Sequence, residues 1–390
     1  MTEEKLFLLD VLKAFVHNEK LNFDVELDWA KLMELSAIHS VTGILDYMVV
    51  QNPCERTAPM LAALKKQCFA NIAVFAQRTD CARQLLAKLS EAGIDHMLMK
   101  GYVVRNYYPV PELRTFGDVD ILIKPDDRGK CHKLMLEQGF SVKTDWEPVY
   151  SYYNNNELYE MHTELMEIDV SDKADYKGYF CKAWEHAVKT DEHEFEPTPE
   201  FHFIYLLTHI AKHINGAGAG IRMYLDLALF IKHFGNSIDW DSIKNELETI
   251  KLSDFANVAF NVVEKCFGIA SPIQLREIKT DTFEDFMNYT MDGGVFGHVG
   301  RDNALITLKN STGTSRTATV VHRLFPKAED IERRYTYLQG KHWLLPVAWV
   351  HRLVKTSASW SAHAEEAKGI MQVDTEEVLK LKKVYKEIGF

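Results

Sequence analysis

Apolar residues recur at three- and four-residue intervals over residues 3–88, which is the spacing of amphipathic helices. Two such series are Leu6, Leu9, Val11, Leu12 and Phe15, and then Trp29, Leu32, Leu35 and Ile38. A further, long helix is expected from Pro59 to Ala92, because Gly93 follows it and glycine favours a helix C-terminus. The pattern therefore predicts an N-terminal helical region over residues 1–92.

From residue 93 onward the pattern predicts strands alternating with helices. Short strands are expected at Ile94–Met99 and Asp118–Ile123, and a β-hairpin at Trp146–Leu165 that turns at Asn154–Asn156. Helices are expected at Tyr102–Tyr107 and Pro125–Gln138. The acidic stretch Lys189–Glu196, followed by Pro197 and Pro199, lacks periodicity and is predicted to be a linker. Residues 93–196 are thus predicted to form an α+β core.

The remainder, residues 197–390, is predicted to be helical again. Helices are expected at Phe201–Ile214 and Ile221–Phe234, and helix alternates with turn over Leu324–Lys355. Residues 270–318 contain several glycines and a Ser/Thr-rich run, which predicts a long loop or flap. A polar helix is expected within Ala362–Phe390.

The net charge limits the classes of partner that we expect, and the cysteine content limits the kinds of site. The formal net charge of −11 argues against long nucleic acid or an anionic membrane as the partner, so a phosphate ligand must be met by a local site. The six cysteines have no paired spacing, which predicts neither a disulfide framework nor a zinc knuckle. The N-terminus carries acids where a signal peptide is basic, and no run of 18 apolar residues occurs. We expect a cytoplasmic protein.

The clearest candidate chemistry lies in Asp118 and Asp120, which alternate with apolar residues at the start of a predicted strand. Residues two apart on a strand share a face, so the two carboxylates lie about 6 to 7 Å apart. Like charges at that distance repel unless something positive lies between them. A divalent cation, Mg²⁺ or Mn²⁺, is the natural ligand for such a pair.

A third carboxylate is available on the second run of the predicted hairpin. Glu160, His162 and Glu164 share one face of that run, and Asp169 follows closely in sequence. We take Glu160 as the third metal ligand and a candidate general base, with Glu164 and Asp169 as alternatives. His162 is predicted to support the site rather than to bind the metal.

The residues Lys100 and Gly101 lie where a strand gives way to a helix. Such a turn presents backbone N–H groups to a phosphate. A glycine turn, a strand with two acids and a third acid on a neighbouring strand are what two-metal nucleotidyl transfer requires. The pattern therefore predicts attack of an acceptor hydroxyl on the α-phosphate of a nucleoside triphosphate, with pyrophosphate leaving.

These motifs, in this order, resemble the uncharacterised nucleotidyltransferase family of the polymerase-β-like superfamily. The residues that carry the resemblance are Lys100-Gly101, Tyr107-Tyr108-Pro109, Arg114, Asp118-Val119-Asp120-Ile121-Leu122 and Glu160-Met161-His162. The resemblance implies a polymerase-β-like core embedded in helices, with Asp118, Asp120 and Glu160 as catalytic metal ligands. The wider superfamily has Gly-Ser or Gly-Gly at the turn, so Lys100 would replace a serine hydroxyl as a phosphate contact. Arg114 would either bind phosphate or pair with one of the acids.

Other readings of these residues remain open. The same fold could bind a nucleotide or sugar phosphate without turnover, or serve as a helical scaffold with a vestigial core. His209 and His213 have the four-residue spacing of helical zinc ligands, with His202 seven residues before His209, but no Glu or Cys completes a zinc signature. Polar helix packing or the lining of an acceptor pocket is the expectation for them. Arg222 and Asp226 are expected to form an ion pair.

The acceptor is expected to be a small molecule or a protein side chain. Its identity cannot be read from the sequence.

Overall fold

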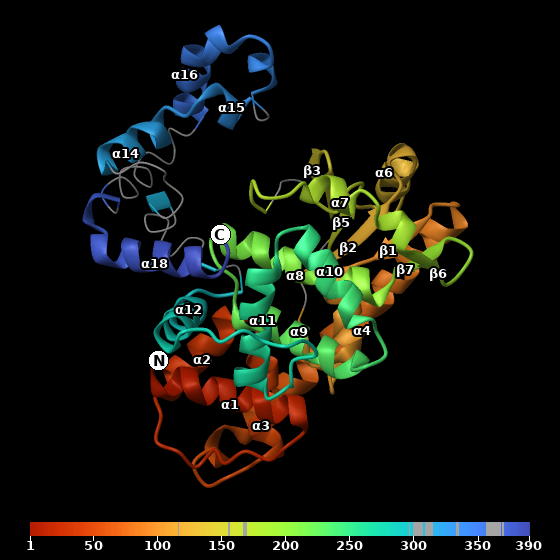
Figure 1. Cartoon of the computed structure of the whole chain (residues 1–390). Helices are drawn as coiled ribbons and strands as arrows, with labels where there is room; N and C mark the ends of the chain where they lie inside the picture. Colours follow the sequence, from red (N-terminus) through yellow and green to blue (C-terminus); the bar gives the residue numbers. More distant parts are fainter. Residues whose placement is uncertain are drawn as a thin grey trace. The chain divides into compact units, whose positions relative to one another are not determined.

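The protein is described here from a computed structural model. The structure describes residues 1–115, 117–154, 157–166, 170–295, 297–298, 307–308, 315–332, 335–355, 368 and 370–390. The chain forms two compact units, Met1–Gly297 with Ile388–Phe390, and His298–Glu387 (Figure 1). The division into regions 1–92, 93–196 and 197–390 stays a prediction.

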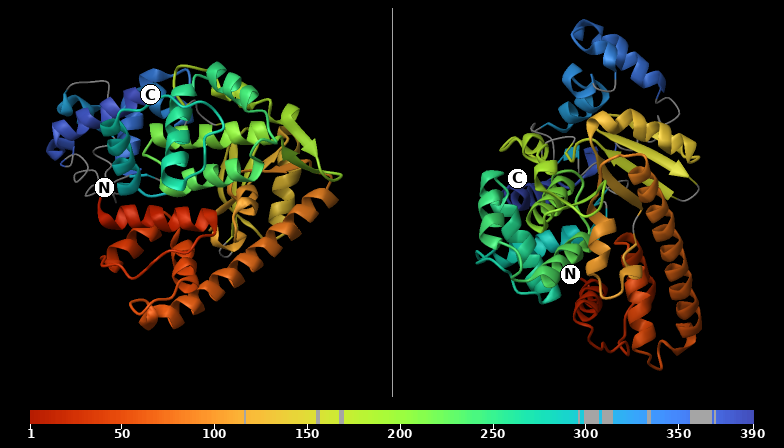
Figure 2. Two further views of the ribbon diagram at one scale, coloured as in Figure 1. Left: turned by 60° about the horizontal axis from the view of Figure 1, so that its bottom comes forward. Right: turned by 90° about the vertical axis from the view of Figure 1, so that its right-hand side faces the viewer.

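The first part of the larger unit is helical, as predicted. Its helices are α1 (Glu3–His17), α2 (Trp29–Ile38), α3 (Thr42–Gln51) and α4 (Leu61–Glu91). Thr2 caps the N-terminus of α1, because its side chain accepts a hydrogen bond from the Lys5 backbone N–H, and Asn18 caps the C-terminus in the left-handed conformation. The long helix α4 runs from the α3 region to the sheet (Figure 2), and its C-terminal half buries apolar side chains such as Leu85 and Leu89.

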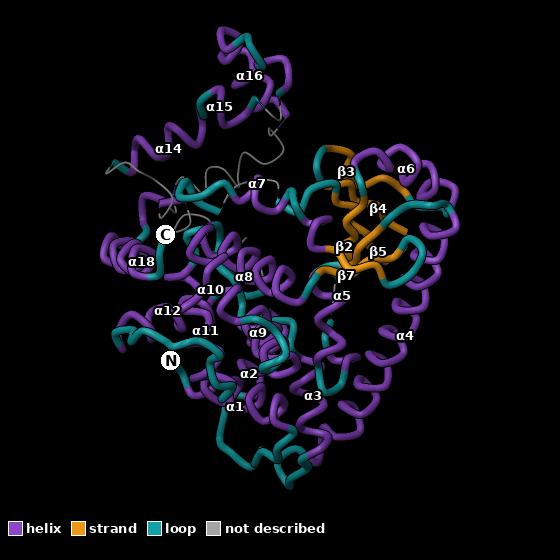
Figure 3. Tube along the Cα trace, turned by 45° about the vertical axis from the view of Figure 1, so that its right-hand side comes forward, coloured by secondary structure: helices purple, strands orange, loops and turns teal. Residues whose placement is uncertain are grey.

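A mixed seven-stranded sheet lies at one side of the larger unit (Figure 3). Its strands are β1 (His96–Leu98), β2 (Asp118–Ile123), β3 (Ser141–Trp146), β4 (Val149–Asn154), β5 (Glu157–His162), β6 (Ala187–Lys189) and β7 (Glu194–Pro197). They are ordered β3-β4-β5-β2-β1-β7-β6. Strand β2 is antiparallel to β1 and parallel to β5, while β4 and β5 form the predicted hairpin. The predicted α+β fold is confirmed.

The two faces of this sheet differ in chemistry. Side chains at alternate positions, such as Val119 and Ile121 of β2 and Met161 of β5, join one hydrophobic core with residues of α4 and α6 (Arg128–Glu137). Because strand side chains alternate between faces, the residues between them point to the opposite side. There Asp118 and Asp120 stand beside Glu160.

The predicted linker over residues 189–199 is wrong. Strands β6 and β7 pair as an antiparallel hairpin, and β7 pairs in parallel with β1, with His96 opposite Glu194. This hairpin forms one edge of the sheet, and charged side chains are common on edge strands because they disfavour pairing with other chains. Strands of three and four residues are too short to show an alternating pattern.

Helices complete the larger unit. They are α5 (Lys100–Val104), α7 (Tyr176–Phe180), α8 (Pro199–Asn215), α9 (Ile221–Phe234), α10 (Trp240–Thr249), α11 (Ser253–Phe267) and α12 (Thr280–Asp292). Helix α12 corrects the loop predicted over residues 270–318, because it buries Phe286, Met287 and Met291 at helical spacing. Residues 296, 299–306 and 309–314 of that predicted loop lie outside the described residues.

The smaller unit contains α14 (Arg316–Leu324), α15 (Ala328–Ile331), α16 (Leu345–Lys355) and α18 (Thr375–Glu387). A small core of Ile331, Tyr335, Leu338 and Ala348 holds part of it together. The helix predicted within Ala362–Phe390 corresponds to α18, while residues 361–367 lie outside the described part. Among the described helices, none is both long and apolar enough to span a membrane.

A buried acid in α3 makes a testable contribution to stability. Asp46 is 2% exposed, its Oδ1 has no hydrogen-bond partner within the described chain, and burial raises its pKa from 3.8 to about 6. A raised carboxyl pKa means that the folded protein binds more protons, so stability falls as pH rises from about 4 to about 6. Asp46→Asn should therefore stabilise the protein by roughly 3 kcal/mol at pH 7 and very little at pH 4. Urea unfolding at both pH values measures this; equal stabilisation at both would contradict it.

Candidate active site

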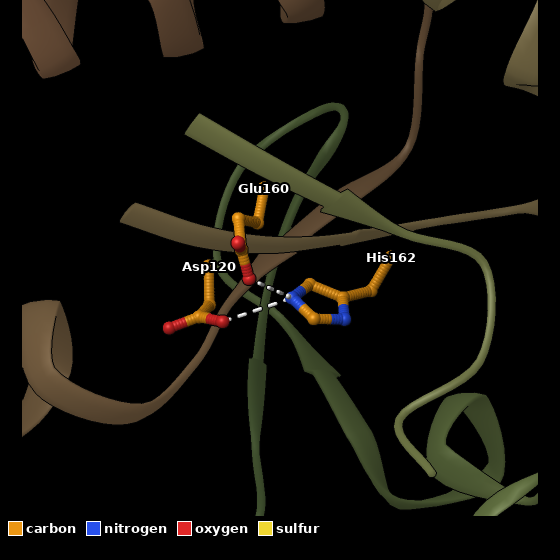
Figure 4. Close-up of side chains that lie close together, drawn as sticks. All are labelled: Asp120, Glu160 and His162. Carbon is orange, nitrogen blue, oxygen red and sulfur yellow. Dashed lines mark hydrogen bonds and ion pairs between the residues drawn. The ribbon is translucent and has the colours of Figure 1, made fainter. Parts of the chain in front are cut away.

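An acidic cluster lies on the face of the sheet opposite the hydrophobic core, where β2 and β5 run in parallel. The register places Asp120 opposite Glu160, and His162 follows two residues later on the same face. Asp120, Glu160 and His162 each offer one ligand atom, and these atoms all lie within 4.8 Å of one another (Figure 4). The cluster is therefore compact enough to hold one metal ion.

Asp120 is surrounded by positive or proton-donating groups. Its Oδ1 lies 2.6 Å from Lys100 Nζ and 2.8 Å from His162 Nε2. Burial alone would raise its pKa, but the lysine charge and the histidine hydrogen bond outweigh burial and hold the pKa of Asp120 well below its usual range. Asp120 is thus a carboxylate at all physiological pH values.

For Asp118 and Glu160, neighbouring positive charges do not outweigh the effect of burial on the pKa. Burial, and then the charge of Asp120, raise the pKa of both Asp118 and Glu160. Glu160 Oε2 lies 3.7 Å from His162 Nε2, and Ser151 donates a long hydrogen bond of 3.5 Å to Glu160 Oε1. Two partly buried carboxylates crowded against a third fit a hard divalent cation, because such an ion supplies the missing charge and accepts oxygen ligands.

The alternative third acids do not join this cluster. Strand β5 ends at His162, so Glu164 lies beyond the strand, where its carboxylate is 2.9 Å from Lys177 Nζ. Asp169 lies outside the described residues. His162 forms a hydrogen bond with the Asp120 carboxylate, a position compatible with the supporting role that we predict.

The Lys100-Gly101 turn forms the wall beside the acids. Lys100 adopts a left-handed φ of 52° at the start of α5, which aims its side chain at Asp120. A Cβ added to Gly101 would lie 2.2 Å from Arg114 Nη1. A larger residue at position 101 would therefore displace the buried guanidinium of Arg114.

Arg114 pairs with an acid that we did not expect. Its Nη2 and Nε lie 2.7 and 3.2 Å from the Asp226 carboxylate, and Tyr108 donates a hydrogen bond of 2.6 Å to the same carboxylate. Asp226 thus binds Arg114 and Tyr108, and it does not form the expected pair with Arg222. Arg222 Nη1 instead donates a hydrogen bond of 3.0 Å to the Thr115 carbonyl. This buried network fastens the loop before β2 to α9.

A cavity of about 440 Å³ opens over the acidic cluster. The sheet, the Lys100 turn and helices α8 and α9 supply its lining. Its polar and charged lining residues are Lys100, Arg114, Asp118, Asp120, Thr144, Ser151, Glu160, His162, Tyr205, His209, Lys212, His213, Arg222 and Asp226. The candidate residues Lys100, Gly101, Arg114, Asp118, Asp120 and Glu160 all lie around this one cavity.

The histidines of α8 divide into two groups. His209 and His213 line the cavity and their Nε2 atoms lie 3.1 Å apart, so one donates a hydrogen bond to the other. His202 does not line it; it is 2% exposed and packs against Phe230. Among the described residues, these three histidines do not form a group that could hold a metal ion. Whether His209 and His213 serve polar helix packing or line an acceptor pocket stays a prediction.

The family of the chain follows from its sequence. A family model described as "Uncharacterised nucleotidyltransferase" matches residues 25–268, which include the whole sheet and helices α8 and α9. The chain belongs to the uncharacterised nucleotidyltransferase family. This confirms the resemblance and, with the α+β fold, the predicted nucleotidyltransferase core.

Other comparisons add little to the family assignment. No curated protein matches the sequence. Two solved structures of the antibiotic-resistance factor ANT(2'')-Ia, one in solution and one a crystal structure in complex with adenylyl-2''-tobramycin, align at 12% identity with TM-scores of 0.33 and 0.32. Each alignment covers 45% of this chain, and 92% and 98% of the two ANT(2'')-Ia chains.

Proposed function

We propose that the protein is a metal-dependent nucleotidyltransferase that moves a nucleoside monophosphate from a nucleoside triphosphate to an acceptor hydroxyl and releases pyrophosphate. The observation that carries this proposal is the acidic cluster at the base of a cavity rimmed by cationic side chains. The family assignment supports the transfer chemistry. A cytoplasmic location is part of the proposal.

Asp118, Asp120 and Glu160 are the proposed ligands of Mg²⁺ or Mn²⁺. Carboxylate oxygens are the donors that these ions prefer. Burial, and then the charge of Asp120, raise the pKa of Asp118 and Glu160, and a divalent cation would offset both effects. His162 Nε2, close to both Asp120 and Glu160, would orient these carboxylates or complete the ligand set. When bound, the metal supplies charge neutralisation to the phosphate oxygens.

Lys100, Gly101 and Arg114 are proposed to line the nucleotide side of the cavity. Lys100 carries a buried ammonium whose pKa is raised, because the charge of Asp120 outweighs burial. It would turn from Asp120 to the triphosphate once another cation neutralises that carboxylate. Arg114 is held to Asp226 through two nitrogens, so it contributes a fixed positive charge rather than a mobile one.

The reaction needs only positioning and charge from these side chains. The acceptor oxygen bonds to the α-phosphorus, the bond from that phosphorus to the bridging oxygen of the β-phosphate breaks, and pyrophosphate leaves with that oxygen. The hydroxyl proton passes to a base on the protein.

Calorimetry with each of the four common nucleoside triphosphates and Mg²⁺ tests the site. The protein should bind at least one of them, and a variant carrying Asp118→Ala and Asp120→Ala should lose most of that affinity, because it lacks two of the three ligands. Equal binding by both proteins, or binding by neither, would reject the proposal. Circular dichroism of the variant shows whether it is folded.

A binding module without turnover is the second candidate. It is favoured by the Lys100–Asp120 ion pair, which neutralises a metal-ligand carboxylate without any metal. Such a module would bind a nucleotide or sugar phosphate but release no pyrophosphate when acceptors are supplied.

A further inference from the structure

The wall of the cavity that faces the acidic cluster is formed by helix α8. Tyr205, His209 and His213 lie one helical turn apart on the side of α8 that lines the cavity. Tyr205 is 1% exposed, and burial raises its pKa to about 12, so its hydroxyl stays protonated. The α8 wall therefore offers hydrogen-bonding groups without a negative charge.

The two histidines of this wall are also neutral. Burial, and then the charge of Lys100, lower the pKa of His209 well below its usual value, and burial lowers that of His213 to about 4. The hydrogen bond between their Nε2 atoms fixes opposite roles for these two nitrogens, with one protonated and the other not. When His209 Nε2–H donates to His213, the free lone pair of His209 lies on Nδ1, and this nitrogen can accept a proton.

The carboxylates that line the cavity are already engaged. Asp226 is held by Arg114 and Tyr108. Asp120 and Glu160 belong to the compact cluster, and Asp118 is the third proposed metal ligand. A carboxylate that coordinates a divalent cation loses basicity, which weakens Glu160 as a general base. Among the described residues lining the cavity, His209 and His213 are then the remaining neutral bases outside the cluster.

We propose that His209, held in place by His213, binds the acceptor and removes its proton, and that the acceptor is an uncharged compound presenting a hydroxyl group. The inference rests on the proposed nucleotidyl transfer. In this step the acceptor oxygen forms its bond to the α-phosphorus, its proton moves to the His209 imidazole, and pyrophosphate departs. A cationic acceptor is disfavoured because the described lining leaves no carboxylate to receive it.

Nucleotide binding would increase the basicity of His209. Lys100 is the largest of the neighbouring charges that depress the basicity of His209, ahead of His213 and Lys212, while Asp120 acts in the opposite direction. A triphosphate against Lys100 neutralises its charge, so the basicity of His209 increases when the donor is bound. The proton would then be taken only in the donor complex.

The experiment compares the full-length protein with His209→Gln and a matched control, His202→Gln, which changes a buried histidine of the same helix outside the cavity. Pyrophosphate release is measured with water, glucose, glucosamine and an uncharged peptide containing Ser, Thr and Tyr, and nucleotide affinity is measured by calorimetry. His209→Gln should lower the turnover rate about 100-fold with nucleotide affinity unchanged, whereas His202→Gln should leave both unchanged. Imidazole in solution should restore part of the activity of His209→Ala.

Glucose or the peptide should stimulate turnover over water more than glucosamine does, and the stronger of the two identifies a small-molecule or a protein acceptor. Three results would overturn the inference: a His209→Gln rate within threefold of the parent rate, an equal loss in His202→Gln, or no stimulation by either uncharged hydroxyl compound. If the parent protein neither binds a nucleotide nor releases pyrophosphate, the proposed function itself fails, which is a separate outcome.

Discussion

Asp120→Asn is expected to lower the rate of pyrophosphate release by about 10³-fold or more. Asp120 is the most buried acid of the cluster, and it links the proposed metal site to Lys100 and His162. An amide has nearly the same shape but brings no charge, so the transition state loses metal-mediated stabilisation worth several kcal/mol. The rate is measured with the preferred nucleotide and excess Mg²⁺, using heat-treated cell extract as the source of acceptor.

Glu164→Gln is the matched control for this variant. Glu164 lies on the same segment as Glu160, but it pairs with Lys177 outside the acidic cluster. Its removal should leave the rate within about twofold, because an exposed ion pair contributes little. If Glu164→Gln lowered the rate as strongly as Asp120→Asn, the assignment of Glu160 as the third ligand would be wrong.

Arg114→Ala is expected to destabilise the protein by about 3 to 5 kcal/mol, since it leaves the Asp226 carboxylate buried without its cation. Both side chains are less than a tenth exposed, with values of 8% for Arg114 and 9% for Asp226. The loss is measured as the free energy of unfolding in urea. A loss below about 1 kcal/mol would show that water or another cation replaces the guanidinium.

A variant that replaces both Arg114 and Asp226 separates the energetic contribution of the ion pair from that of side-chain packing. Arg114→Met with Asp226→Leu removes both charges and retains much of the volume, so it should recover a large part of the stability lost in Arg114→Ala. If the stable double variant also loses nucleotide affinity, Arg114 contributes to nucleotide binding in addition to holding α9. If its affinity is unchanged, Arg114 is a positioning residue only.

Much of the site could be predicted because its elements have strong local patterns. The alternation of Asp118 and Asp120 with apolar residues gives β2 its observed bounds, and the Asn-rich turn predicts the hairpin that carries Glu160. Strand spacing then fixes which side chains share a face. The prediction that the strand of Glu160 neighbours β2 rested on the chemistry of a metal site rather than on a local pattern, since pairing between strands far apart in the chain depends on tertiary packing.

The wrong predictions concern residues whose structure depends on partners far away in the sequence. The Lys189–Glu196 stretch is polar, and its strand character comes from pairing with β1 rather than from its own composition. Arg222 and Asp226 have the spacing of a helical ion pair, but Tyr108 and Arg114, more than a hundred residues earlier, bind the Asp226 carboxylate first. The contact of Lys100 with Asp120 was not predicted either, because it depends on a left-handed backbone that no local motif indicates. The phosphate contact of Lys100 stays a prediction.

The most direct test follows the α- and the γ-phosphate of a labelled nucleoside triphosphate. The protein is incubated with Mg²⁺, an acceptor source and a nucleoside triphosphate labelled in either the α- or the γ-phosphate. Nucleotidyl transfer predicts that the α-label moves to the acceptor and the γ-label appears in pyrophosphate, and that chelation of the metal or Asp120→Asn abolishes both. Transfer of the γ-label to the acceptor, or label transfer that survives chelation and Asp120→Asn, would contradict the proposed function.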